Sequence, residues 1–165
     1  MSVPTIRKAV ETDIKALCRL YYAFHEFHVA GVPDRLVTLG PIEKFDCSQL
    51  ITELKKILEN PYAEIFVAEM DDHIIGLAEI YIREDEPNPQ RVAYRYGHLQ
   101  SLMVNPEYQG RNIGKLLVST AENWARKKGA VETRLDTWEF KSDPIKFYEK
   151  CGYRTIRRRM VHPFK

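Results

Sequence analysis

The run from residue 102 to residue 117 constrains the fold more than any other part of the chain, because it joins a strand, a tight turn and a helix. An apolar stretch ends at Asn105-Pro106, and residues 109–114 then read Gln-Gly-Arg-Asn-Ile-Gly. Apolar residues at helical spacing begin at Ile113. A helix that starts at such a turn leaves free backbone N–H groups and a positive dipole end at one point. The run therefore predicts a site for an anion at the start of this helix.

Length and composition restrict the class of protein. The chain has 165 residues, the size of one ordinary domain, and 44% of them are hydrophobic, which is enough for a core and excludes a disordered chain. Lys and Arg number 25 against 23 Asp and Glu, so the net charge of +2 gives no case for binding nucleic acid or a membrane surface. We expect a single domain over residues 1–165 with neither of these partners.

The cysteines indicate the compartment. Cys18, Cys47 and Cys151 are odd in number and widely spaced, which argues against a disulfide framework and against a zinc site. Residues 1–10 lack the apolar core of a secretory signal, and no apolar run approaches the length of a membrane span. We therefore expect a cytoplasmic protein without a bound metal.

Hydrophobic periodicity divides the chain into ten elements. Strands are expected over residues 5–9, 62–70, 73–83, 91–104, 131–138 and 153–161. Helices are expected over residues 13–31, 48–60, 112–128 and 144–151, the last of them capped by Asp143 and ended by Gly152. The order β, α, α, β, β, β, α, β, α, β implies an α/β (α+β) fold with one mixed sheet and helices on both faces.

Two motifs resemble the GNAT superfamily of N-acetyltransferases, whose element order is also the one expected here. Gln109-Gly110-Arg111-Asn112-Ile113-Gly114 is similar to its pyrophosphate loop, Gln/Arg-x-x-Gly-x-Gly/Ala, with Asn112 where glycine is usual. Asparagine tolerates left-handed backbone better than other non-glycine residues, so the same turn can form with Asn112 in place of glycine. The run from Pro144 to Tyr153 is similar to the superfamily's Ala-Ile-x-Phe-Tyr-x-x-x-Gly-Phe. Lys141 stands where many members have asparagine. The resemblance implies a mostly antiparallel central sheet with a splayed strand pair.

The resemblance also implies acetyl-CoA as the cosubstrate and places it on particular residues. The pyrophosphate would lie on the turn and the first helical residues, namely Gln109, Gly110, Arg111, Asn112, Ile113, Gly114 and Lys115. The pantetheine arm would lie along Leu102, Met103 and Val104, where the splayed strand offers free main-chain groups. One N–H of this strand would stabilise the tetrahedral oxyanion.

Catalysis of acetyl transfer needs an acid and a base. Tyr148 matches the superfamily's position for the acid that protonates the leaving thiolate, although packing beside Phe147 is the alternative interpretation. An alkylamine has a pKa of roughly 10, so a base must remove a proton before attack. Asp136 and Glu79 are the candidates, and a chain of waters is a further alternative. Many members have an acid near the position of Gln100, where this chain has an amide. His98 lies two residues before Gln100, on the same face of that strand.

These features predict an N-acetyltransferase in which a primary amine attacks the thioester directly, in a ternary complex. We expect a small-molecule acceptor bound near Tyr22, Phe24, His28 and residues 32–46, since the superfamily binds it near the first two helices. Three alternatives remain: a protein N-terminal or lysine acetyltransferase, a non-catalytic acyl-CoA-binding sensor, and a nucleic-acid-binding module built on residues 157–159. A homodimer is the default expectation, because many relatives form dimers.

Overall fold

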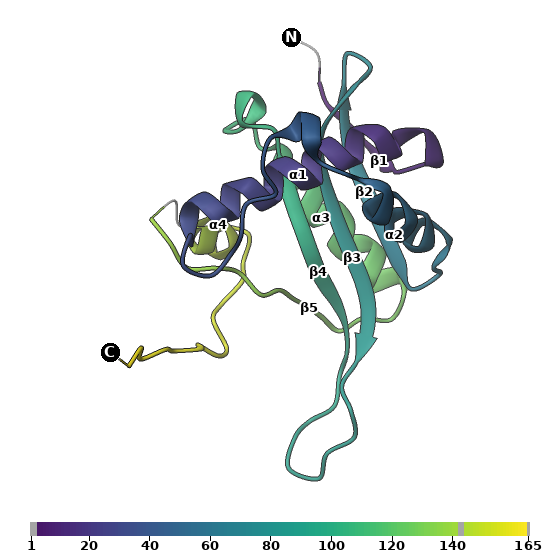
Figure 1. Cartoon of the computed structure of the whole chain (residues 1–165). Helices are drawn as coiled ribbons and strands as arrows, with labels where there is room; N and C mark the ends of the chain where they lie inside the picture. Colours follow the sequence, from purple (N-terminus) through teal and green to yellow (C-terminus); the bar gives the residue numbers. More distant parts are fainter. Residues whose placement is uncertain (1–2, 142–143, 165) are drawn as a thin grey trace.

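The computed structural model describes residues 3–141 and 144–164, and it contains one five-stranded sheet with the strand order β1-β2-β3-β4-β5 (Figure 1). The strands are β1 (Thr5–Lys8), β2 (Ala63–Met70), β3 (His73–Glu84), β4 (Arg95–Val104) and β5 (Glu132–Arg134). The first four strands pair antiparallel, and β5 pairs parallel to β4. This is the mixed sheet that the element order predicts, and it is mostly antiparallel, as the family resemblance implies.

Helices cover both faces of the sheet (Figure 1). The α-helices are α1 (Ile14–Gly31), α2 (Ser48–Glu59), α3 (Ile113–Lys127) and α4 (Pro144–Lys150), and 3₁₀ turns lie at η1 (Glu11–Asp13), η2 (Ile42–Lys44) and η3 (Pro106–Tyr108). None of the helices in the described ranges is long and apolar enough to cross a membrane.

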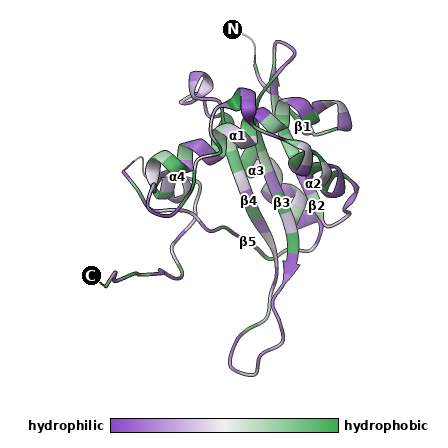
Figure 2. Cartoon of the chain, in the orientation of Figure 1, coloured by the Kyte–Doolittle hydropathy of each residue, from purple (hydrophilic) through white to green (hydrophobic). Residues whose placement is uncertain are grey.

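Alternating side chains of the central strands build two separate cores. Ile65 and Val67 of β2 pack toward α1 and α2, whereas Phe66 and Ala68 pack toward α3. This alternation follows from the period of two in a strand, and it makes β2 apolar on both faces. Figure 2 shows apolar residues along these central strands accordingly.

A β-bulge interrupts β4 opposite β3. Glu79 lies opposite Ser101 and Ile80 lies opposite Leu99, so Gln100 has no partner residue in β3. An extra residue of this kind bends the strand and increases its twist. Beyond the bulge, Leu102 and Val104 face α3, whereas Met103 is buried on the side of α1 and α2.

Three sequence-based expectations for the sheet are wrong. Residues 154–164 form no strand, although a strand was expected over residues 153–161. β4 begins at Arg95 rather than at residue 91, and β5 ends at Arg134 rather than at residue 138. Alternation shows only that a segment can pair, and a strand also needs a neighbouring strand to accept its hydrogen bonds. The expected helix cap, Asp143, lies outside the described residues.

An ion pair with a nearly buried carboxylate joins β1 to η1, the 3₁₀ turn directly before α1. The carboxylate of Asp13 accepts hydrogen bonds from Arg7 Nη1 at 2.7 Å, from Arg7 Nη2 at 3.0 Å and from the backbone N–H of Val10 at 2.8 Å. The Arg7 guanidinium holds the pKa of Asp13 below its usual value. Because the pKa is lower in the folded chain than in the unfolded chain, the ionised carboxylate stabilises the fold at neutral pH, and this contribution is lost as the pH falls through the folded pKa.

We expect Asp13→Asn to lower the free energy of unfolding at neutral pH by about 1–3 kcal/mol, because the Arg7 charge and the Val10 N–H lose a charged acceptor. Urea unfolding of the two proteins should show this gap, and the gap should shrink below about pH 4 as the wild-type carboxylate is protonated. Asp34→Asn is the control, since the Asp34 side chain is 72% exposed. An equal loss in both variants, or a gap that does not change with pH, would contradict the assignment.

Candidate active site

The turn before α3 has the geometry of an anion cradle. Gly110 has φ +77° and Asn112 has φ +62°, so both adopt left-handed backbone. No side-chain cap satisfies the start of α3, and the N–H of Leu116 is the first to bond back, to Asn112 O at 3.0 Å. The N–H groups of the first helical turn are therefore available to an anion. Asn112 thus adopts the left-handed backbone that asparagine was expected to tolerate at this position.

Two side chains hold this turn in place. Gln109 Nε2 donates a hydrogen bond to Val104 O at 3.0 Å, which ties the turn to the end of β4. Arg111 extends over the ring of Tyr108, with 5.3 Å from its guanidinium carbon to the ring centroid. Arg111 and Lys115 are both exposed, so their charges face solvent beside the cradle.

The role of Gly114 is to admit another helix. A Cβ atom at this position would lie 3.1 Å from Cζ of Phe147 in α4. This contact brings α4, with its neighbouring residue Tyr148, against the start of α3. The small size of Gly114 therefore favours this close approach, whereas Gly110 is favoured by its positive φ.

The main chain of β4 is open on one side over most of its length. In the described part of the chain, β5 pairs with β4 only at Tyr96, Gly97 and His98. Residues 99–104 consequently have β3 on one side and no strand on the other. The predicted contacts from Leu102, Met103 and Val104 therefore concern their backbone groups, because the side chains of all three pack into the two cores.

Tyr148 is packed against other aromatic rings. Its ring centroid lies 5.2 Å from that of Phe147 and 5.7 Å from that of Tyr153. Burial raises the pKa of Tyr148 to about 12, with a smaller contribution from Cys151. The phenol is therefore protonated at neutral pH and can donate a proton or a hydrogen bond.

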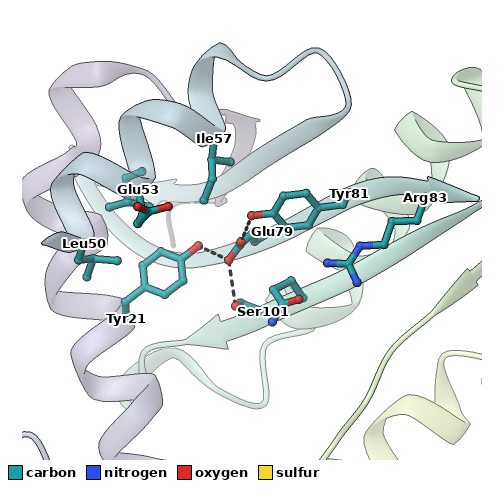
Figure 3. Close-up of a pocket in the computed structure, with 10 residues that line it drawn as sticks. Tyr21, Leu50, Glu53, Ile57, Glu79, Tyr81, Arg83 and Ser101 are labelled. Carbon is teal, nitrogen blue, oxygen red and sulfur yellow. Dashed lines mark hydrogen bonds between the residues drawn. The ribbon is translucent and has the colours of Figure 1, made fainter.

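Glu79, which lies opposite Ser101 beside the bulge, is the centre of a buried hydrogen-bond cluster (Figure 3). Glu79 is 5% exposed. Its carboxylate accepts hydrogen bonds from Tyr21 Oη at 2.6 Å, Tyr81 Oη at 2.6 Å and Ser101 Oγ at 3.0 Å. Burial, together with the adjacent Glu79 charge, raises the pKa of Tyr21 and of Tyr81, so both hydroxyls stay protonated. The cluster therefore holds one negative charge among three neutral donors.

This cluster forms one wall of a cleft of about 430 Å³. Figure 3 shows Leu50, Glu53 and Ile57 of α2 above it and Arg83 at its other end. Gln100, the bulge residue, also lines the cleft. Glu53 forms an ion pair with Lys56 at 2.9 Å. Glu79, in contrast, is buried and accepts its hydrogen bonds from neutral hydroxyls.

His98 and Asp136 lie at the boundary between β4 and β5. His98 Nε2 lies 3.1 Å from Gln100 Oε1. Burial lowers the pKa of His98, the Arg83 charge lowers it further, and Asp136 and Glu79 act in the opposite direction. Asp136 is exposed and follows the end of β5. The prediction that Asp136 lies on this strand is therefore wrong. Neither Asp136 nor Tyr148 lines the cleft that contains Glu79.

The predicted acceptor region lies at the end of α1 and in the segment that follows. Tyr22 Oη donates to Gly40 O, and Glu26 accepts from Thr38 Oγ1 and from the N–H of Leu39. His28 is surrounded by the rings of Phe24, Phe27 and Phe140 at 4.4–5.9 Å. These contacts give the residues here a structural role in fixing the connection from α1 to α2.

Comparison with known proteins identifies the family. The sequence model described as "Acetyltransferase (GNAT) family" matches residues 18–153, which is most of the chain. The chain belongs to the GNAT family. Within the described residues, no group of three or more His, Cys, Asp or Glu side chains could hold a metal ion.

Individual GNAT proteins are similar over different lengths. A glucosamine 6-phosphate N-acetyltransferase from Trypanosoma brucei brucei is 34% identical over 97 residues, which cover 59% of this chain and only 62% of that enzyme. An aminoglycoside N(6')-acetyltransferase type 1 from Stenotrophomonas maltophilia is 25% identical over 158 residues, covering 95% of this chain and 90% of that enzyme. The solved aminoglycoside N-acetyltransferase AAC(6')-Iy, in complex with CoA, superposes with a TM-score of 0.76 at 20% identity, covering 100% of this chain and 97% of that chain. At 20% sequence identity, this structural similarity shows the fold alone.

Sequence reasoning missed the three hydroxyls around Glu79. A signal for one of them was present, because Glu79, Tyr81 and Arg83 alternate along β3 and must share a face. Ser101 faces the same side only because the bulge at Gln100 shifts the register of β4. Tyr21 comes from α1, and nothing in its local sequence separates it from an ordinary core residue.

We expect Gly114→Val to lower the free energy of unfolding by roughly 1–3 kcal/mol, because the new side chain meets the Phe147 ring and must displace α4. Ser119→Val, on the exposed side of the same helix, is the control for placing a β-branched residue in this helix. Thermal unfolding of both variants measures the difference. Equal melting temperatures for the two variants would show that α4 does not depend on a small residue at this position.

Proposed function

We propose that this GNAT protein transfers an acetyl group from acetyl-CoA to a primary amine of a small molecule, with direct attack in a ternary complex. The observation that carries most weight is the left-handed turn at Gly110 and Asn112, placed where the open strand β4 ends and α3 begins. Its free N–H groups and the nearby charges of Arg111 and Lys115 suit a diphosphate. The open edge of residues 99–104 suits an extended arm that takes main-chain hydrogen bonds.

The chain's own groups can then be assigned roles. A backbone N–H on the open edge of β4 donates to the thioester oxygen as it gains charge, and loss of such a donor typically costs about 100- to 1000-fold in rate. Tyr148 donates its phenolic proton to the sulfur as the C–S bond breaks. Glu79 attracts the cationic amine toward the cleft, and the proton leaves to Glu79 or to Asp136.

The size and lining of the cleft support a small acceptor. A volume of about 430 Å³ lies within the usual range of small-molecule pockets. The trypanosomal and Stenotrophomonas relatives are named for a sugar phosphate amine and an aminoglycoside, respectively. A cytoplasmic location is part of this proposal, because Cys18, Cys47 and Cys151 are all free thiols, as a reducing compartment would keep them.

Release of CoA from acetyl-CoA, measured across a panel of amines and peptides, tests the reaction. The panel should hold an amino sugar phosphate, an aminoglycoside, a polyamine, a lysine peptide and a peptide with a free N-terminus. Turnover with one of the first three would identify the acceptor class. Turnover with peptides alone would overturn the small-molecule proposal, and acetyl-CoA binding without any turnover would favour a sensor.

We expect Tyr148→Phe to lower kcat by about 10²- to 10⁴-fold with little change in the Kd for CoA, because only the proton donor is lost. Tyr62→Phe is the control, since Tyr62 is 56% exposed and outside the proposed site. Steady-state kinetics and calorimetric CoA titration separate the two effects. Full activity in Tyr148→Phe would leave Tyr148 with its packing role alone.

The coenzyme site has its own test. We expect the double variant Arg111→Ala/Lys115→Ala to weaken CoA binding by at least about tenfold, because two charges near the diphosphate are lost. Lys127→Ala, at the far end of the same helix, is the control. Unchanged CoA affinity in the double variant would show that these two charges do not hold the diphosphate, whatever the acceptor is.

A further inference from the structure

Strands β3, β4 and β5 carry three arginines, and Arg83 is the one that forms no ion pair in the described part of the chain. Arg95 of β4 pairs with Glu84. Arg134 of β5 pairs with Asp85 at 2.7 Å. Because these two acids directly follow Arg83 in the sequence, the carboxylates nearest to it along the chain are already occupied. The exposed guanidinium of Arg83 therefore remains available to an anion at one end of the cleft.

Arg83 and Glu79 place opposite charges in the same cleft. They lie four residues apart on β3, so both side chains are on one face of this strand. The guanidinium carbon of Arg83 lies 5.4 Å from the ring centroid of Tyr81, and Figure 3 shows the guanidinium turned back toward Glu79. Tyr81 thus stands between the two charges, with its hydroxyl on Glu79 and its ring beside Arg83.

The carboxylate of Glu79 has room for one more hydrogen-bond donor. An ionised carboxylate offers about four acceptor positions on its two oxygens. Oε2 accepts from Tyr21 and from Ser101, whereas Oε1 accepts from Tyr81 alone among the described residues. Oε1 therefore keeps one position for a further donor, such as an N–H of an ammonium group in the cleft.

We propose that the cleft binds an amine that also carries an anion, a carboxylate or a phosphate, with its ammonium group at Glu79 and its anion at Arg83. Four residues of extended strand and a hydrogen bond at each end leave about 7 Å or less between the two charged groups of this ligand. A planar guanidinium can donate two parallel hydrogen bonds to either anion. The role of this ligand as the acetyl acceptor rests on the proposed function, whereas its binding does not.

The same two charges select against other amines. A polycation would bring a second ammonium group toward Arg83, where like charges repel, and a simple alkylamine would leave Arg83 without a partner. The cleft also reaches β4 at Gln100 and Ser101, so an amine held at Glu79 lies beside the strand proposed to bind the thioester. The acceptor class is therefore narrower than small amines in general.

Matched pairs of amines test this selection by acetyl-CoA turnover. The pairs are aminovalerate with pentylamine, phosphoethanolamine with ethanolamine, and an amino sugar phosphate with its free amino sugar. We expect kcat/KM to be at least about tenfold higher for the anionic member, and the pairs show whether carboxylate or phosphate is preferred. Equal kcat/KM within every pair would overturn the proposal.

Variants of Arg83 test which residue makes the selection. Arg83→Gln should remove the advantage of the anionic amine through KM and leave kcat nearly unchanged, because Arg83 does not touch the reacting atoms. Arg83→Lys should keep part of the advantage, since it keeps the charge without the paired hydrogen bonds. Arg91→Gln, in the exposed loop between β3 and β4, is the matched control. An advantage that survives in Arg83→Gln would contradict the assignment.

Calorimetric titration of aminovalerate and phosphoethanolamine into the CoA-bound protein separates this inference from acetyl transfer. Binding that is at least about tenfold weaker in Arg83→Gln, and unchanged in Arg91→Gln, would support the assigned cleft even if no amine is acetylated. Acetylation of simple amines without binding of either probe would support acetyl transfer and overturn this inference. The Kd for CoA should be the same in Arg83→Gln as in the wild type, and a matching loss of CoA affinity would assign Arg83 to the coenzyme instead.

Discussion

The asymmetric pairing of β4 is the constraint on which the rest of the site depends. β3 pairs with β4 from Arg95 to Val104, whereas β5 pairs with β4 at three residues only. The bulge at Gln100 lies just past that departure, opposite Glu79 and Ile80. The departure of β5 opens main-chain groups on one edge of β4, and the bulge brings Ser101 to Glu79 on one face. A regular β4, paired on both sides, would offer neither the open edge nor the cluster.

The sequence predicted those parts of the structure whose causes are local. The turn at residues 109–114 was expected to permit left-handed backbone at Asn112, and φ +62° confirms it. The wrong expectations concern pairing, as in residues 135–138 and 154–161, because alternation describes a strand and not its neighbour. The Glu79 cluster could not be predicted for the same reason. Its members come from α1, β3 and β4, and their meeting depends on the bulge.

The cluster around Glu79 also restricts what this carboxylate can do. Three neutral hydroxyls occupy acceptor positions of its two oxygens, and each hydroxyl has a proton that it keeps at neutral pH. The arrangement stabilises a fixed negative charge in a nearly buried position. Such a charge is suited to attracting an ammonium group, whereas a base must also accept a proton and release it. Asp136 is exposed to solvent after the end of β5 and lies outside this cleft.

Charge is separated within the site although the chain as a whole is almost neutral. Arg111 and Lys115 lie beside the start of α3, where the helix dipole is also positive. Glu79 lies across β4 from them, in the cleft beneath α2. An anionic coenzyme and a cationic amine would therefore be drawn to opposite faces of the same strand, and they would meet only at its open edge. This separation explains why the net charge of +2 carries no information about the substrates.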